Sequence, residues 1–279
     1  DMYVLQYAEE SRARAAYETL KKDKQLLIVE PDRILSVCSI EASEEDEAEG
    51  NDTITEEVKS SSQNGTGEIG FSGYAMENFG NVSASASYLS WGVKYTNSDV
   101  YANYLQSKNK RRKVIVAVVD SGVDTSHKLL KKRIGKKGYD FVESDANPKD
   151  ENSHGTHCAG TIVDCTRGLP FIKLMPVRVL DANGNGSTFT VSLGVKYATK
   201  KKADVISMSL GGGHDLTLDK AIKAAVKKNI VVVVSAGNES SNTRSVCPAH
   251  IKPCITVAAI NQYGSRAYFS NYGSAVDVA

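Results

Sequence analysis

Polar, glycine-containing segments of this sequence carry residue types that can do nucleophilic chemistry. Asp120 ends an apolar run, His154 lies in Ser-His-Gly-Thr-His, and Asn238 ends Ser-Ala-Gly-Asn. A neutral imidazole can take a proton from a serine hydroxyl, and a buried carboxylate can orient that imidazole. An amide N–H can stabilise the negative charge that develops on a carbonyl oxygen. Asp120, His154 and Asn238 therefore offer the three residue types that acyl transfer needs: a carboxylate, an imidazole base and an oxyanion donor.

Apolar, β-branched runs alternate with helix-like stretches from residue 113 onward, and these elements must position the candidate residues. Strands are expected at 114–119, 173–179, 205–210, 230–234 and 255–260. Helices are expected at 154–163, at 188–201 behind Ser187, and at 216–228 behind Asp215. Near-continuous Val and Ile runs predict strands buried on both faces, so the fold class is α/β with a mostly parallel sheet flanked by helices. The carboxyl ends of such strands share one edge, where ligands bind.

Three motifs, in this order, resemble the aspartate, histidine and oxyanion-hole motifs of the subtilisin-like serine proteases. They are Val-Asp-Ser-Gly-Val-Asp at 119–124, Ser-His-Gly-Thr-His-Cys-Ala-Gly-Thr at 153–161 and Ser-Ala-Gly-Asn at 235–238. The resemblance covers 113–279 and implies a serine endopeptidase that cleaves polypeptides through an acyl-enzyme. It also implies that substrate binds along Ser209, Leu210, Gly211 and Gly184.

The resemblance further implies a nucleophilic serine in a Gly-Thr-Ser-Met-Ala run downstream of Asn238. Residues 1–279 contain no such run, so the nucleophile is expected beyond Ala279 and this fragment is expected to be inactive. One alternative is a non-catalytic, peptide-binding relative (a pseudoprotease). A second alternative, a nucleotide-binding α/β protein, is suggested by the glycines at 211–213, but no G-x-G-x-x-G run follows the first strand.

The chain divides into three regions by composition and resemblance. Residues 1–37 resemble part of an inhibitory propeptide: a strand at 2–7, a helix at 9–24 and a strand at 25–29 make a unit too short for its own core. We expect this unit to dock in cis as a folding aid and inhibitor, with the tail after Asp32 running toward the cleft. Residues 38–110 form an acidic, Ser/Gly-rich linker and lead-in, and 39–85 are expected to be disordered or a solvated insertion. Residues 111–279 are the N-terminal part of the catalytic domain.

Charge and hydropathy exclude two classes of partner. The chain has 34 basic and 33 acidic residues, so no overall charge draws it to nucleic acid. No apolar run approaches the ~18 residues that a membrane span needs. The resemblance implies a secreted protein, although no signal peptide is present in this chain.

The sequence assigns neither a metal site nor a disulfide to particular residues. His154 and His157 are spaced i, i+3 without an evident third ligand, so no metal is assigned. The usual calcium site of the family is expected to be absent, because Leu129 stands where its aspartate is expected and the connection 164–173 is short. Cys158 is expected to be a buried free thiol. Pairing among Cys165, Cys247 and Cys254 stays open.

Overall fold

The computed structural model describes residues 5, 9–22, 28, 30–38, 90–108, 112–136 and 138–279. Asp1–Ser39 and Ser90–Ala279 form one compact unit. The expected strands at 2–7 and 25–29 fall outside the described residues except for Leu5 and Ile28, and the expected linker at 39–85 falls outside them entirely. Within the first region, the helix expected at 9–24 is present as α1, Glu10–Leu20.

A six-stranded sheet lies at the centre of the unit, with its strands in the order β3-β4-β2-β6-β8-β9. Every neighbouring pair in it is parallel, which confirms the predicted α/β class. The strands are β2 (Val114–Asp120), β3 (Tyr139–Asp140), β4 (Ile172–Arg178), β6 (Val205–Met208), β8 (Val231–Ser235) and β9 (Ile255–Val257).

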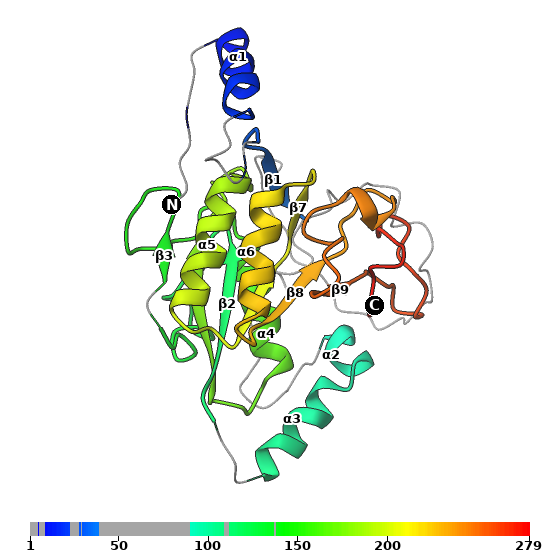
Figure 1. Ribbon diagram of the computed structural model, residues 1–279. Coiled ribbons are helices and arrows are strands. Elements are labelled where there is room, and N and C mark those ends of the chain that lie inside the picture. Colours follow the sequence, from blue (N-terminus) through cyan, green and yellow to red (C-terminus); the bar gives the residue numbers. More distant parts are fainter. Residues whose placement is uncertain are drawn as a thin grey trace, which may run out of the picture. The chain divides into compact units, whose positions relative to one another are not determined.

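Helices cover both faces of this sheet, as Figure 1 shows. They are α4 (His154–Cys165), α5 (Thr188–Lys200) and α6 (Leu216–Val226). Alternate residues of β2 face opposite layers: Ala117 and Val119 belong to the core that contains α5 and α6, while Val116 and Val118 pack in the core that contains α4. Both predicted N-caps are present, because the Ser187 side chain accepts from the Thr190 amide and the Asp215 side chain accepts from the Leu218 amide.

A smaller antiparallel sheet brings the N-terminal region against the rest of the unit. Its order is β5 (Asn185–Ser187), β1 (Ile34–Val37) and β7 (Leu210–Gly212). In Figure 1 the dark blue β1 lies beside the yellow β7. We expected a single strand at 205–210, and the end of this prediction was wrong. Strand β6 ends at Met208, and the chain enters the second sheet at Leu210.

Three further helices were not predicted: α2 (Trp91–Tyr95), α3 (Ser98–Ser107) and the 3₁₀ helix η3 (Thr243–Ser245). The first two lie within the region expected to be linker and lead-in. Among the described residues, none of the helices combines the length and apolar character needed to cross a membrane.

Candidate active site

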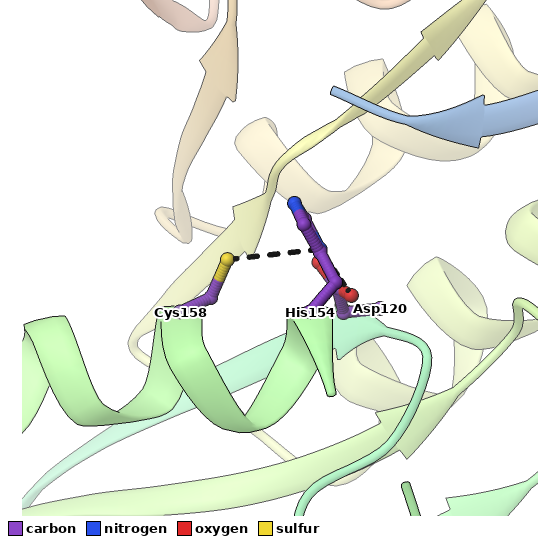
Figure 2. Close-up of side chains that lie close together, drawn as sticks. All are labelled: Asp120, His154 and Cys158. Atoms are coloured by element: carbon purple, nitrogen blue, oxygen red, sulfur yellow. Dashed lines mark hydrogen bonds and ion pairs between the residues drawn. The ribbon is translucent and has the colours of Figure 1, made fainter. Parts of the chain in front are cut away.

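Asp120 and His154 meet at the carboxyl end of the parallel sheet. Asp120 is the last residue of β2, and His154 is the first residue of α4. The His154 Nδ1 atom lies 2.8 Å from Asp120 Oδ1, the same oxygen that accepts a hydrogen bond from the Ser121 amide. Asp120 is buried, while 13% of the His154 side chain stays exposed. Figure 2 shows the imidazole standing above the carboxylate. The carboxylate therefore fixes one ring nitrogen and leaves Nε2 for proton transfer.

The burial and the charges around His154 act on its pKa in opposite directions. Burial alone lowers the pKa, but the hydrogen bond and the negative charge of Asp120, helped by Cys158, raise it to about 10. Cys158 lies one turn along α4, with its Sγ atom 3.8 Å from His154 Nδ1. The ligand atoms of Asp120, His154 and Cys158 lie within 4.8 Å of one another, a spacing that could also hold a metal ion.

The start of α4 is held by Asp150, a residue that sequence reasoning missed. One of its carboxylate oxygens accepts from the Asn152 and Ser153 amides and from the Ser121 hydroxyl, and the other accepts from the amide and hydroxyl of Thr156. The Asp150 side chain thus replaces a local N-cap, because Ser153 has a left-handed backbone and makes no side-chain cap. Asp150 stands three residues before the N-cap position, where sequence reasoning does not look for a capping side chain.

Gly155 lets α4 approach the end of β2. A Cβ atom at this position would lie 2.1 Å from the Gly122 carbonyl oxygen and 3.2 Å from the Asp120 side chain. Any larger residue would push His154 away from Asp120, so the glycine in Ser-His-Gly-Thr-His is required by packing.

The four residues predicted to bind substrate all contact β1 or the residue after it. The Ser209 carbonyl accepts from the Cys38 amide at 3.0 Å, and the Gly184 carbonyl accepts from the Val37 amide at 2.9 Å. Leu210 and Gly211 pair with Val37 and Ser36 in the antiparallel ladder. The structure therefore brings these residues together around an extended segment.

Glycine at the far end of β7 makes room for that segment. A Cβ atom on Gly212 would lie 2.7 Å from the Leu35 side chain and 2.8 Å from the Ile34 carbonyl oxygen. Leu35 itself is completely buried, whereas Ile34 is 72% exposed. Together with β5, β7 thus forms a cleft that takes one strand and buries one of its side chains.

Asn238 is half-buried in the turn that follows β8, at the same end of the parallel sheet as Asp120. The buried Asn271, also missed from the sequence, holds this turn: its side-chain oxygen accepts from the Glu239 and Ser241 amides, and its Nδ2 donates to the Ala236 carbonyl. Before the turn, the Ser235 hydroxyl donates to Cys38 Sγ at 3.0 Å. The turn that carries Asn238 therefore borders the end of the segment in the cleft.

All five cysteines lie among the described residues, and each is a free thiol. Cys158 is a free thiol as expected, but it is half-buried and not buried. Cys165 is also half-buried, while Cys247 and Cys254 are buried. Burial raises the pKa of both Cys247 and Cys254 to about 12, so neither forms a thiolate at neutral pH.

The aspartate–histidine pair thus lies at the carboxyl end of the parallel sheet of an α/β fold, beside a cleft that holds one extended strand. Residues 111–279 match the family model described as the subtilase family, which is a peptidase family. The chain belongs to the subtilase family, as the motifs predicted.

Individual relatives agree with this assignment. The chain is 44% identical to the extracellular serine proteinase of Thermus sp. (strain Rt41A) over 58% of its own length and 40% of the relative. It is 37% identical to subtilisin-like protease 2 of Pseudogymnoascus destructans over 73% of its own length and 53% of the relative. The chain thus spans about half of these curated relatives or less.

A solved structure shares the fold. The crystal structure of a cold adapted subtilisin-like serine proteinase matches with a TM-score of 0.57 and 35% identity, covering 62% of this chain and 64% of that one.

Proposed function

We propose that the whole protein is a serine endopeptidase that hydrolyses polypeptides through an acyl-enzyme. The observation that carries the proposal is the 2.8 Å contact between Asp120 and His154 beside a cleft that binds an extended chain. In this proposal His154 takes the proton of a serine hydroxyl, and Asp120 orients the ring and stabilises the imidazolium. Asn238 donates to the oxyanion from the turn after β8.

The nucleophile of this proposal is a serine in a Gly-Thr-Ser-Met-Ala setting, as the family resemblance implies. Residues 1–279 hold no such run, and the Ser235 hydroxyl is already bonded to Cys38 Sγ. Activity is therefore tested on the full-length protein, and residues 1–279 by themselves should be inactive.

The N-terminal region acts, in this proposal, as a propeptide in cis that occupies the cleft like a substrate. Three features support it: β1 pairs on both edges, its Leu35 is buried, and the Val37 and Cys38 amides bond to the cleft carbonyls of Gly184 and Ser209. Main-chain pairing of this kind recognises an extended peptide without regard to most of its side chains.

Two acidic side chains of the same region bind the amino ends of helices. Asp32 Oδ1 accepts from the Phe189 amide and the Thr188 hydroxyl at the start of α5. The Glu30 carboxylate accepts from the Leu216 and Thr217 amides at the start of α6. Carboxylates are stabilised at helix amino termini, so these contacts anchor the region ahead of β1.

The bond after Cys38 is the proposed processing site, because Cys38 is the residue whose amide reaches Ser209 and whose Sγ lies beside Ser235. Mass spectrometry of the active protein should find a mature chain beginning at Ser39. A protein that is active with residues 30–38 still covalently attached would contradict this assignment.

We also propose that the protein is secreted. One relative is named an extracellular serine proteinase, which supports this proposal. The full-length protein should be recovered from culture medium rather than from cells.

A fluorophosphonate probe tests the catalytic proposal directly, since it labels only an activated serine. The full-length protein should be labelled and should degrade casein, and His154→Ala should abolish both. His157→Ala is the matched control, because His157 is exposed on the same helix and should leave both unchanged. A full-length protein that binds peptide but is never labelled would instead support a non-catalytic, peptide-binding relative.

A further inference from the structure

His214, Asp219 and His250 form a side-chain cluster that the proposed catalysis does not use. His214 follows β7, Asp219 lies in the first turn of α6, and His250 lies in the turn after Pro248. Asp219 is buried, His250 is half-buried, and His214 is half-exposed. Each offers one ligand atom, and these atoms lie within 4.8 Å of one another.

The distances in the cluster match the edges of a metal coordination shell. His250 Nε2 lies 3.2 Å from Asp219 Oδ1, and His214 Nε2 lies 3.9 Å from Asp219 Oδ2. Two ligands at the usual Zn–N and Zn–O lengths are about 3.3 Å apart when the geometry is tetrahedral. The His250 contact already fits, and a small rotation of the half-exposed His214 ring would bring its nitrogen to the same spacing.

The second nitrogen of His250 has the partner that a metal-binding histidine needs. His250 Nδ1 lies 3.0 Å from the Val246 carbonyl oxygen, which can only accept a hydrogen bond. If only Nδ1 carries a proton, the Nε2 lone pair faces a carboxylate oxygen that also has only lone pairs. Either a second proton on the ring or a cation between the two atoms removes this conflict, and a backbone carbonyl on the outer nitrogen is the usual way to orient a ligating imidazole.

Two other groups face Asp219. The Lys223 ammonium lies 3.0 Å from Oδ2, and the Cys247 thiol lies 3.8 Å from Oδ1. Lys223 is half-exposed and is bonded to Oδ2, the oxygen that His214 also approaches, so Oδ1, which lies 3.2 Å from His250 Nε2, is the oxygen left for a cation. Cys247 is buried, and its thiol donates a hydrogen bond to Asp219 Oδ1.

We propose that His214, Asp219 and His250 bind one divalent cation of the zinc class, with the fourth position open to water. Two imidazoles and one carboxylate suit Zn²⁺, Co²⁺ or Ni²⁺ rather than Ca²⁺ or Mg²⁺, which prefer oxygen ligands alone. The proposal does not rest on protease activity.

A cation at this site would also affect the edge of the cleft that β7 forms. Gly212 exchanges two backbone hydrogen bonds with Cys247, at 2.9 and 3.0 Å, and also pairs with Leu35 of β1. A cation held by His214 and His250 would join β7 to the segment around Cys247 a second time, and would fix both to α6. It would thereby stiffen one edge of the cleft.

Zinc titration of the full-length protein tests the site. All variants carry His154→Ala, which removes the cluster of Asp120, His154 and Cys158 as a competing site and prevents self-cleavage. Isothermal titration should find one Zn²⁺ site, and Co²⁺ in its place should give the absorption of a four-coordinate complex. Adding His214→Ala or His250→Ala should weaken Zn²⁺ binding at least ~100-fold, since losing only the hydrogen-bond partner of a metal-binding residue already costs up to about that factor.

His127→Ala is the matched control, because His127 is an exposed histidine outside the cluster and its loss should leave the affinity unchanged. Circular dichroism checks that each variant is folded. If His250→Ala unfolds, Asp219→Asn takes its place in the titration, because the asparagine side chain has the same shape as the buried aspartate. An absence of zinc binding in the His154→Ala parent would overturn the proposal, as would an affinity that His214→Ala leaves unchanged.

Discussion

Replacing Leu35 by alanine should loosen β1 in the cleft, and the structure allows the effect to be sized. Leu35 is fully buried against the main core, and removing a buried leucine side chain costs about 2–5 kcal/mol. The lower part of this range, about 2–3 kcal/mol, applies because β1 lies in a cleft that can relax or take up water after the change. At 1.4 kcal/mol per factor of ten, docking of β1 should weaken by about 30- to 100-fold.

Hydrogen exchange of two amides measures this docking without requiring activity. The Val37 and Cys38 amides bond to the carbonyl oxygens of Gly184 and Ser209, so they exchange only when the strand leaves the cleft. In Leu35→Ala both should exchange about 30- to 100-fold faster. The Val118 amide, in the middle of β2, reports global opening and should change far less.

Ile34→Ala is the matched control for this experiment. Ile34 is the neighbouring residue on the same strand but is 72% exposed, so its truncation should change exchange by less than about threefold. Equal acceleration in the two variants, or none in Leu35→Ala, would refute the reasoning that the buried leucine holds the segment in place.

Three further predictions concern the site. An NMR titration of the His154 ring should give a pKa near 10, well above the ordinary histidine value. Asp120→Asn should lower this pKa, because the carboxylate favours the imidazolium. A ring that titrates at the ordinary histidine value in both proteins would exclude this coupling. In the full-length enzyme, kcat/KM should accordingly rise with pH toward the alkaline range, since only the neutral ring acts as a base. Asp150→Ala should lower the free energy of unfolding by about 1–2 kcal/mol in a denaturant titration, because the Ser153 and Thr156 amides at the start of α4 lose their acceptor. Glu143→Ala, a change at an exposed position, should leave the free energy of unfolding unchanged. Equal values for the two variants would contradict the capping role. Asn238→Ala in the full-length enzyme should reduce kcat by about 10²–10³, the range known for subtilisin, with little change in KM, and an unchanged kcat would remove Asn238 from the oxyanion hole.

The sequence predicted the parts of the fold that local patterns determine. Buried Val and Ile runs located five of the six strands of the parallel sheet, and only the two-residue edge strand β3 was missed. Ser187 and Asp215 marked the starts of two helices. The aspartate and histidine motifs fell at the ends of such elements, so their meeting could be expected from parallel topology alone.

Elements that exist only through tertiary pairing could not be predicted. Residues 34–37 are too short a run to identify a strand, and Leu-Gly-Gly at 210–212 has weak β-propensity. Both become strands because each supplies the other with an antiparallel partner. The helices at 91–107 lie in a stretch that adjoins the polar linker, and composition alone assigned them to the lead-in.

Side chains that act across long sequence distances were missed for the same reason, as with Asn271, which holds a turn about thirty residues earlier in the chain. Asp150 was missed although it is close in sequence, because it precedes α4 by four residues instead of standing at the N-cap position. His214 and His250 have no metal-binding spacing, since the chain brings them together only through β7 and the turn after Pro248.

The turnover of a peptide substrate by the full-length protein, compared with its His154→Ala and His157→Ala variants, tests the catalytic role of the Asp120–His154 pair most directly. His154→Ala should lower kcat by about 10⁶, the loss known for the equivalent change in subtilisin, while His157→Ala should stay within about threefold of the parent. A His154→Ala protein that retains turnover, or a loss of the same size in His157→Ala, would contradict the assignment of His154 as the base.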